Sequence, residues 1–196
     1  MKKVLASVLM MMAGAAAAQV ATIDESSLQY SGTGCPQGSL EYTITADGKL
    51  DFDFFENNAD TDAINLVAHK NCLIKVRVYA PTGYQIAPSS VTLTGEAIVA
   101  AMGNANASAK LSLVGVPELS AGKVFAGGFQ GSFEVSSASS SLNFSTCGGY
   151  LDLKIRSQLR AERSVQDISQ TSVLLQDGVT NRPFSIRCPI IFNPCH

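Results

Sequence analysis

The sequence contains no tryptophan and only two histidines among its 196 residues. Charged residues make up only 15% of the chain, which has 16 acidic and 14 basic residues. A chain with this charge balance is not suited to bind nucleic acid or an anionic membrane non-specifically, because such binding needs a basic surface. The hydrophobic share of 46% also excludes an intrinsically disordered chain. The length fits one domain.

The motifs of common hydrolases are missing as well. No Gly-x-Ser-x-Gly is present, and His69 is the sole internal imidazole that could act as a base. The sequence Ser120-Ala121-Gly122-Lys123 matches Ser-x-x-Lys, but it lies at an expected turn before a strand and not at the start of a helix. We therefore assign no catalytic residue.

Residues 1–18 are predicted to be a signal peptide. Lys2 and Lys3 give a positive start, residues 4–18 are uncharged and apolar, and Ala16-Ala17-Ala18 supplies a cleavage site before Gln19. The apolar run is shorter than the roughly 20 residues that a membrane span needs, and no other stretch reaches that length. We expect residues 19–196 to be secreted, either extracellular or periplasmic, with 12 basic and 16 acidic residues.

Strands dominate the expected structure. Residues 151–161 alternate between an apolar set (such as Leu153 and Ile155) and a charged set (such as Lys154 and Arg156), which a helix of 3.6 residues per turn could not keep apart. The Ala-rich stretch 97–109 is the one helix candidate, but Gly103 and two Asn interrupt it. The expected strands are 40–44, 50–54, 72–80, 84–86, 91–101, 110–114, 123–130, 132–135, 151–161, 171–176 and 184–192.

About ten short strands separated by turn residues predict an all-β fold, an antiparallel β-sandwich of jelly-roll or Greek-key-like type. No linker divides the chain, so residues 19–196 are expected to form a single domain, in which 189–196 is a short C-terminal tail. The Ser-rich run 136–141 is expected to be an exposed hairpin loop.

All five cysteines lie beyond the predicted leader, in a compartment where disulfides persist. No Cys-x-x-Cys occurs, so structural disulfides are favoured over a zinc site. Spacing alone does not select the pairs.

An ordered set of short motifs surrounds these cysteines. Gly32-Thr33-Gly34-Cys35-Pro36 comes first, and Lys70-Asn71-Cys72 begins a strand that ends in Pro81-Thr82-Gly83-Tyr84. Gly95 within a strand, Cys147-Gly148 and Phe184-Ser185-Ile186-Arg187-Cys188 follow. This order resembles the secreted proteins of the domain of unknown function 4360 family, over residues 22–188. Two features depart from that pattern: Ile186 stands near a position where the family often has Trp, and residues 189–196 extend past the usual end.

The resemblance implies four framework cysteines, Cys35, Cys72, Cys147 and Cys188, arranged as an N-terminal and a C-terminal pair. We expect Cys35 to pair with Cys72 and Cys147 with Cys188, leaving Cys195 free or bonded between chains. The alternative joins Cys188 to Cys195 and leaves Cys147 unpaired. The resemblance implies no activity.

Carboxylates cluster between residues 51 and 62, where Asp60 and Asp62 are weak calcium candidates. No Gly provides the sharp turn of an EF-hand loop, so a solvated loop without a cofactor is the favoured interpretation. The carboxylates also allow the hypothesis of a small secreted hydrolase, although the sequence establishes no cleft between two of them.

The charged strand face Lys154, Arg156 and Arg160, with Arg163 beyond it, could bind an acidic surface or simply face solvent. Tyr79 and Tyr84 are the exposed-aromatic candidates for a glycan. The sequence therefore favours a secreted, non-catalytic β-sandwich protein that binds an unidentified surface, glycan or protein ligand; the hydrolase is the alternative.

Overall fold

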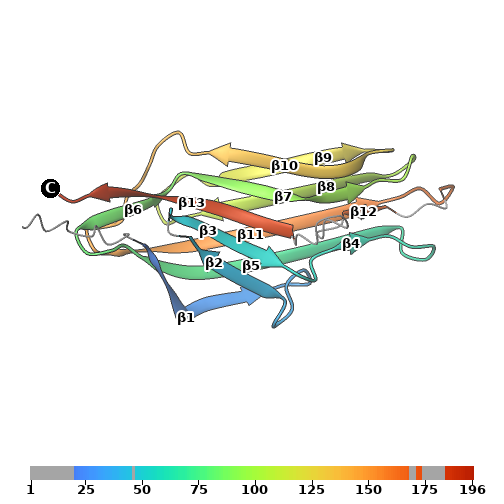
Figure 1. Cartoon of the computed structure of the whole chain (residues 1–196). Helices are drawn as coiled ribbons and strands as arrows, with labels where there is room; N and C mark the ends of the chain where they lie inside the picture. Colours follow the sequence, from blue (N-terminus) through green and yellow to red (C-terminus); the bar gives the residue numbers. More distant parts are fainter. Residues whose placement is uncertain (1–19, 46, 168–170, 174–183) are drawn as a thin grey trace, which may run out of the picture.

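The computed structural model describes residues 20–45, 47–167, 171–173 and 184–196, in which two antiparallel β-sheets pack face to face (Figure 1). The chain is all-β: the described residues form thirteen strands and no helix. No described helix could therefore span a membrane. The predicted signal peptide, residues 1–18, lies outside the described residues.

The first sheet has five strands in the order β1-β5-β11-β8-β9. Its centre is the pairing of two 13-residue strands, which runs from Tyr79 opposite Tyr150 to Val67 opposite Glu162. The strands of this sheet are β1 (Thr22–Ser31), β5 (Val67–Tyr79), β11 (Tyr150–Glu162), β8 (Asn104–Ser112) and β9 (Leu119–Ala126).

The second sheet follows the order β2-β3-β13-β7-β12-β4, with β10 paired to β7 and β6 paired to β13. Neighbours in both sheets are mostly distant in sequence, so the chain crosses repeatedly between the sheets, as Greek-key sandwiches do. Its strands are β2 (Leu40–Ile44), β3 (Lys49–Phe54), β4 (Ala59–Asp60), β6 (Tyr84–Pro88), β7 (Ser90–Ile98), β10 (Gln130–Ala138), β12 (Ser172–Val173) and β13 (Phe184–Pro194).

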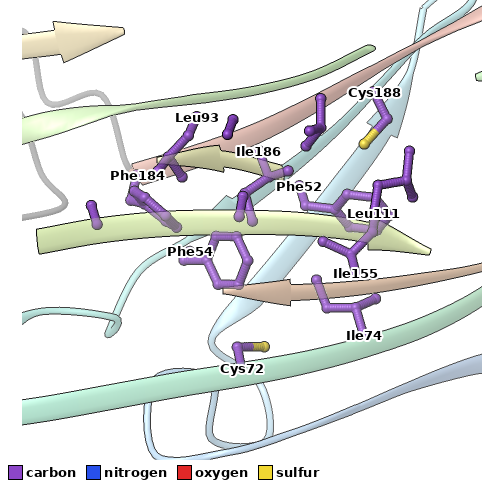
Figure 2. Packing of buried hydrophobic residues seen from close by; sticks show 14 of the residues in the cluster. Phe52, Phe54, Cys72, Ile74, Leu93, Leu111, Ile155, Phe184, Ile186 and Cys188 are labelled. Atoms are coloured by element: carbon purple, nitrogen blue, oxygen red, sulfur yellow. The ribbon is translucent and has the colours of Figure 1, made fainter. Parts of the chain in front are cut away.

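The alternation seen in the sequence places one face of each strand in a shared core (Figure 2). In β11, Leu153, Ile155 and Leu159 are fully buried, whereas Arg156 is exposed. From the opposite sheet, Phe54 and Phe184 meet with ring centroids 5.1 Å apart. Burial of this apolar surface between the sheets is the main favourable contribution to folding.

Several boundaries differ from the sequence-based expectation. Strand β8 begins at Asn104 and not at residue 110, because Ala105, Ala107 and Ala109 continue the buried face of this strand toward its start. Strand β1 was not predicted, and β10 takes in part of the Ser-rich run, up to Ala138. Only Ser172 and Val173 of the expected strand 171–176 are assigned to a strand, and residues 174–176 lie outside the described residues.

The C-terminal tail is corrected too. Strand β13 continues to Pro194, and its second half pairs with β6, from Ile190 opposite Pro88 to Pro194 opposite Tyr84. Residues 189–194 are therefore part of the second sheet.

One disulfide joins Cys35 to Cys72, with Cα atoms 5.5 Å apart, as the resemblance implied. The expected Cys147–Cys188 pair is wrong: Cys147 is bonded to Cys195, with Cα atoms 6.0 Å apart. Cys188 is the free cysteine, and it is completely buried. The alternative pairing of Cys188 with Cys195 is wrong as well.

The period of strand β13 explains why Cys188 forms no disulfide. Phe184, Ile186, Cys188 and Ile190 form the buried face of β13, so the thiol points into the core beside the residues of Figure 2. This burial raises the pKa of the Cys188 thiol to about 12. A group held in this way is a small hydrophobic side chain and not a reactive thiol.

The turn before β6 brings the actual partners together. The N–H of Cys195 donates to the carbonyl of Gly83 at 2.9 Å, and the N–H of Gly148 donates to the carbonyl of Tyr84 at 2.7 Å. Cys195 and Gly148, the residue after Cys147, are thus anchored at the consecutive residues Gly83 and Tyr84, which brings the two cysteines together.

Candidate functional site

The charged side chains of β5 and β11 share the outer face of the first sheet. The register places Tyr79 opposite Tyr150, Arg77 opposite Asp152 and Lys75 opposite Lys154. These three pairs form consecutive rows, because alternate residues of a strand point to the same face. The expected charged face of β11 therefore continues across β5.

The Arg77 row is internally neutralised. The Nε of Arg77 lies 2.9 Å from Oδ1 of Asp152, and the guanidinium carbon of Arg77 lies 4.1 Å from the centre of the Tyr150 ring. The hydrogen bond to Asp152 raises the pKa of Arg77 above its usual value, so its charge is permanent. Tyr150 also meets Tyr79 edge to face at a centroid distance of 5.6 Å, and both rings remain exposed (46% and 37%).

The next row carries an unneutralised charge. Lys75 and Lys154 lie directly opposite one another, and the ammonium group of neither makes an ion pair or hydrogen bond with the part of the chain that the structure describes. Directly opposed side chains have Cβ atoms about 4.5–5.5 Å apart, and like charges at that position destabilise a sheet. This row is therefore a site of positive potential.

A bulge in β1 forms one wall beside this row. Asp24 pairs with Arg77 and Gln29 with Lys75, so β1 advances by five residues where β5 advances by two. Oδ1 of Asp24 accepts hydrogen bonds from the N–H and hydroxyl of Ser26, at 3.1 and 2.6 Å. The N–H of Arg77 donates to the hydroxyl of Ser27 at 2.8 Å. The short Asp-Glu-Ser-Ser segment thus builds the bulge and fastens it to β5.

The end of β8 forms the opposite wall. Ser112 pairs with Lys154, and the chain then turns through Leu113 to Val114, which is 95% exposed. Glu118 closes this turn by accepting from the Ser112 hydroxyl at 2.8 Å and pairing with Lys110 at 3.0 Å. The hydrogen bond from Lys110 lowers the pKa of Glu118, which keeps the carboxylate ionised.

Between these walls lies a groove of about 620 Å³, which we call the β1–β8 groove. This volume is within the range of about 300–1,000 Å³ that is typical of ligand sites. The groove has three cationic side chains (Lys75, Arg77 and Lys154) and two carboxylates (Asp24 and Asp152). Since Asp152 is bound to Arg77, the two lysines remain available for an anionic group.

The other candidates from the sequence do not join this groove. Arg156 and Arg160 lie further along the exposed face of β11, where Arg160 pairs with Glu162. Arg163 lies past the end of β11. His69 is exposed on β5 opposite Arg160, with no carboxylate paired to it among the described residues.

The calcium candidates have other partners. Oδ1 of Asp62 accepts from the backbone N–H groups of Ile64 and Asn65, at 2.8 and 2.7 Å, and Asn65 lowers the pKa of Asp62 in this turn. Asp60 accepts from the amide of Asn58, while its Oδ1 is buried without a hydrogen bond. Within the described ranges, no group of three or more His, Cys, Asp or Glu is placed to hold a metal ion.

The remaining clustered carboxylates lie on the second sheet. Asp53 faces Glu41 across β2 and β3, and Asp51 lies 2.7 Å from Arg187 on β13. Desolvation, followed by the charges of Asp51 and Glu41, raises the pKa of Asp53. The sequence cluster 51–62 is thus divided among β3, β4 and the turn after β4, and none of its described carboxylates forms an ion pair with His69.

A disulfide-linked β-sandwich with an open, charged groove on one sheet is the class of protein defined by these observations. The chain belongs to the domain of unknown function 4360 family, whose model matches residues 21–195. The match includes Cys195, so this cysteine is part of the family domain and does not lie beyond it.

No curated protein matches the sequence. Among solved structures, the chain is similar to the carbohydrate-binding module TmCBM61 in complex with β-1,4-galactotriose. The two are 11% identical, and the similarity covers 89% of this chain and 87% of the other, with a TM-score of 0.28. A score this low does not define a shared arrangement of strands.

Proposed function

We propose that this protein is a secreted, non-catalytic binding protein that holds an anionic ligand in the β1–β8 groove. The observation that carries the proposal is the unneutralised pair of Lys75 and Lys154, which lie opposite each other in a groove of about 620 Å³. An anion between the two ammonium groups would relieve their repulsion and gain charge-assisted hydrogen bonds.

The secreted location is supported by the predicted signal peptide and by two disulfides. Disulfides persist outside the reducing cytosol. Protein purified from its native host should begin at Gln19, and N-terminal sequencing that finds Met1 would contradict this location.

The non-catalytic role is supported by the partners of the groove's carboxylates. Asp152 is bound to Arg77 and Asp24 to Ser26. Hydrolysis by a pair of carboxylates needs both of them free to exchange protons, and Asp24 is the one carboxylate of the groove lining that has no ion pair with a described residue. The proposal includes no metal and no cofactor.

Retention in native affinity gels tests the binding. The probes are polygalacturonate, dextran sulfate and neutral dextran, at about 20 and 200 mM salt. Salt screens exposed charges over about 10 Å at 0.1 M, so retention by an acidic polymer should weaken at the higher concentration. Neutral dextran should not retain the protein.

The decisive variant is the double substitution Lys75→Gln and Lys154→Gln. Hydrogen bonds to charged groups contribute about 1.5–3 kcal/mol each, so the double variant should bind at least about tenfold more weakly. Lys49→Gln is the matched control, because Lys49 is exposed on the second sheet and pairs with Asp47. Failure of both acidic polymers to retain the wild-type protein would overturn the proposal, as would equal retention of the double variant.

A further inference from the structure

A second cavity of about 270 Å³ adjoins the β1–β8 groove along β1 and β5. Gln29 and Lys75 line both cavities, so the two meet at these side chains. Beyond them, Ser31 lies opposite Leu73 on the same outer face. The surface therefore continues from the bulge of β1 toward the end of that strand.

The two cavities differ in chemistry. In the second cavity, Lys75 at the border is the one charged residue, and the rest of the outward lining is the Gln29 amide, the Ser31 hydroxyl and the apolar Leu73 side chain. Such a surface fits a ring that has hydroxyls on its edge and an apolar face. The first cavity, by contrast, fits an anionic group at Lys75 and Lys154.

We infer that the ligand is a linear acidic polysaccharide that fills both cavities, with one acidic sugar at Lys75 and Lys154 and the next sugar against Gln29, Ser31 and Leu73. This inference rests on the proposed function and specifies its ligand class. Lys75 borders both cavities, so a single chain of linked sugars can occupy them without a break.

The charge pattern favours a polysaccharide over a nucleic acid. Asp24 and Asp152 line the groove together with the lysines, and the whole chain has a net charge of −2. Nucleic-acid sites are strongly basic, whereas two carboxylates line this groove beside its three cations. Sugar hydroxyls, on the other hand, can donate hydrogen bonds to carboxylates.

The floor of the groove also disfavours an extended peptide. Strand β5 is paired with β1 on one side and with β11 on the other, so its backbone N–H and C=O groups are already used. A peptide that binds by strand addition needs a free sheet edge. Recognition here falls to side chains, which suits a polymer that offers hydroxyls and carboxylates.

Chain-length dependence tests the inference with the wild-type protein alone. Isothermal titration compares galacturonic acid with its linear trimer and hexamer, because the second subsite contributes only when a linked unit can reach it. We expect the trimer to bind at least about tenfold more tightly than the monomer, with a smaller further gain for the hexamer after correction for the number of binding registers.

A variant locates the second subsite. Ser31→Phe fills the second cavity from an exposed position, so it should leave monomer binding unchanged and remove the gain of the trimer. Ser132→Phe is the matched control, since Ser132 is exposed on β10 of the other sheet. Thermal melting confirms that both variants are folded.

The outcomes separate the two proposals. Equal affinity for monomer, trimer and hexamer would overturn the polysaccharide inference and leave anion binding intact. Absence of binding to polygalacturonate and dextran sulfate would overturn the proposed function itself. Tighter binding of single-stranded RNA or poly-glutamate than of a galacturonate oligomer of equal charge would reject the ligand class.

Discussion

Removal of the Cys147–Cys195 bond by the double substitution Cys147→Ser and Cys195→Ser should strongly destabilise the protein. The two residues are separated by 48 positions. In the chain-entropy model a loop of that length restricts the unfolded chain by about 4 kcal/mol at 25 °C. The two ends are also held in the folded state by hydrogen bonds at Gly83 and Tyr84. Most of the calculated loss should therefore appear in the free energy of unfolding.

Urea unfolding without reductant measures this loss, with Cys188→Ala as the comparison. Cys188 is buried and unpaired, so its replacement removes one sulfur from the core and should cost clearly less than the double substitution. Peptide mapping of the native protein should link the Cys147 and Cys195 peptides, and thiol reagents should label Cys188 only after unfolding. A larger effect of Cys188→Ala, or a link between Cys147 and Cys188, would refute the assignment.

The core and the carboxylates of the second sheet provide two further tests. Ile155→Ala should cost about 2–5 kcal/mol in urea unfolding and Arg156→Ala less than about 0.5, because only Ile155 is buried; equal costs would contradict the packing of β11. Asp53 has a raised pKa in the folded protein, so its favourable contribution is complete below the unfolded value near pH 3.9 and is lost as the pH rises through the folded pKa. Asp53→Asn should consequently be more stable than the wild type at pH 7, and this advantage should shrink toward pH 4; an advantage that is the same at both pH values would count against the cause assigned.

The sequence predicts strands well where side chains differ sharply between the two faces. Strand β11 is such a case, since leucine and isoleucine alternate with charged residues. Strand β8 was predicted only in its last part, because alanine alternating with asparagine and serine gives little contrast in hydropathy. The pairing of β8 with β11 determines that these alanines are buried, and this pairing is a tertiary interaction.

Strand β1 was missed for a different reason. Its core-facing side chains are Ile23, Leu28 and Tyr30, and the bulge places four residues, an even number, between Ile23 and Leu28. A period of two is therefore interrupted in the sequence although the strand continues in space. The same bulge forms one wall of the β1–β8 groove. The irregularity that prevents prediction of the strand is therefore also part of the candidate site.

The site itself was only half visible in the sequence. Lys154 and Arg156 mark a charged face on one strand, and Lys75 and Arg77 mark one on another. Nothing local indicates that these strands are neighbours, or that Lys75 lies opposite Lys154 and not opposite Asp152. A shift of register by two residues would have placed Lys75 opposite Asp152 and neutralised its charge. The unneutralised lysine pair is therefore a consequence of tertiary structure.

The lysine pair also links function to stability. Like charges directly opposite in a sheet are unfavourable, and cross-strand pairs differ by about 0.2–1 kcal/mol. Lys154→Gln should therefore stabilise the unliganded protein by a few tenths of a kcal/mol to about 1 kcal/mol while it weakens binding of acidic polymers. Lys49→Gln, which removes the same charge beside Asp47, should show neither change. Urea unfolding and affinity gels on the same two variants measure both effects. A loss of stability in Lys154→Gln would mean that the lysine has a favourable partner in the folded protein, and the argument for an open anion site would fail.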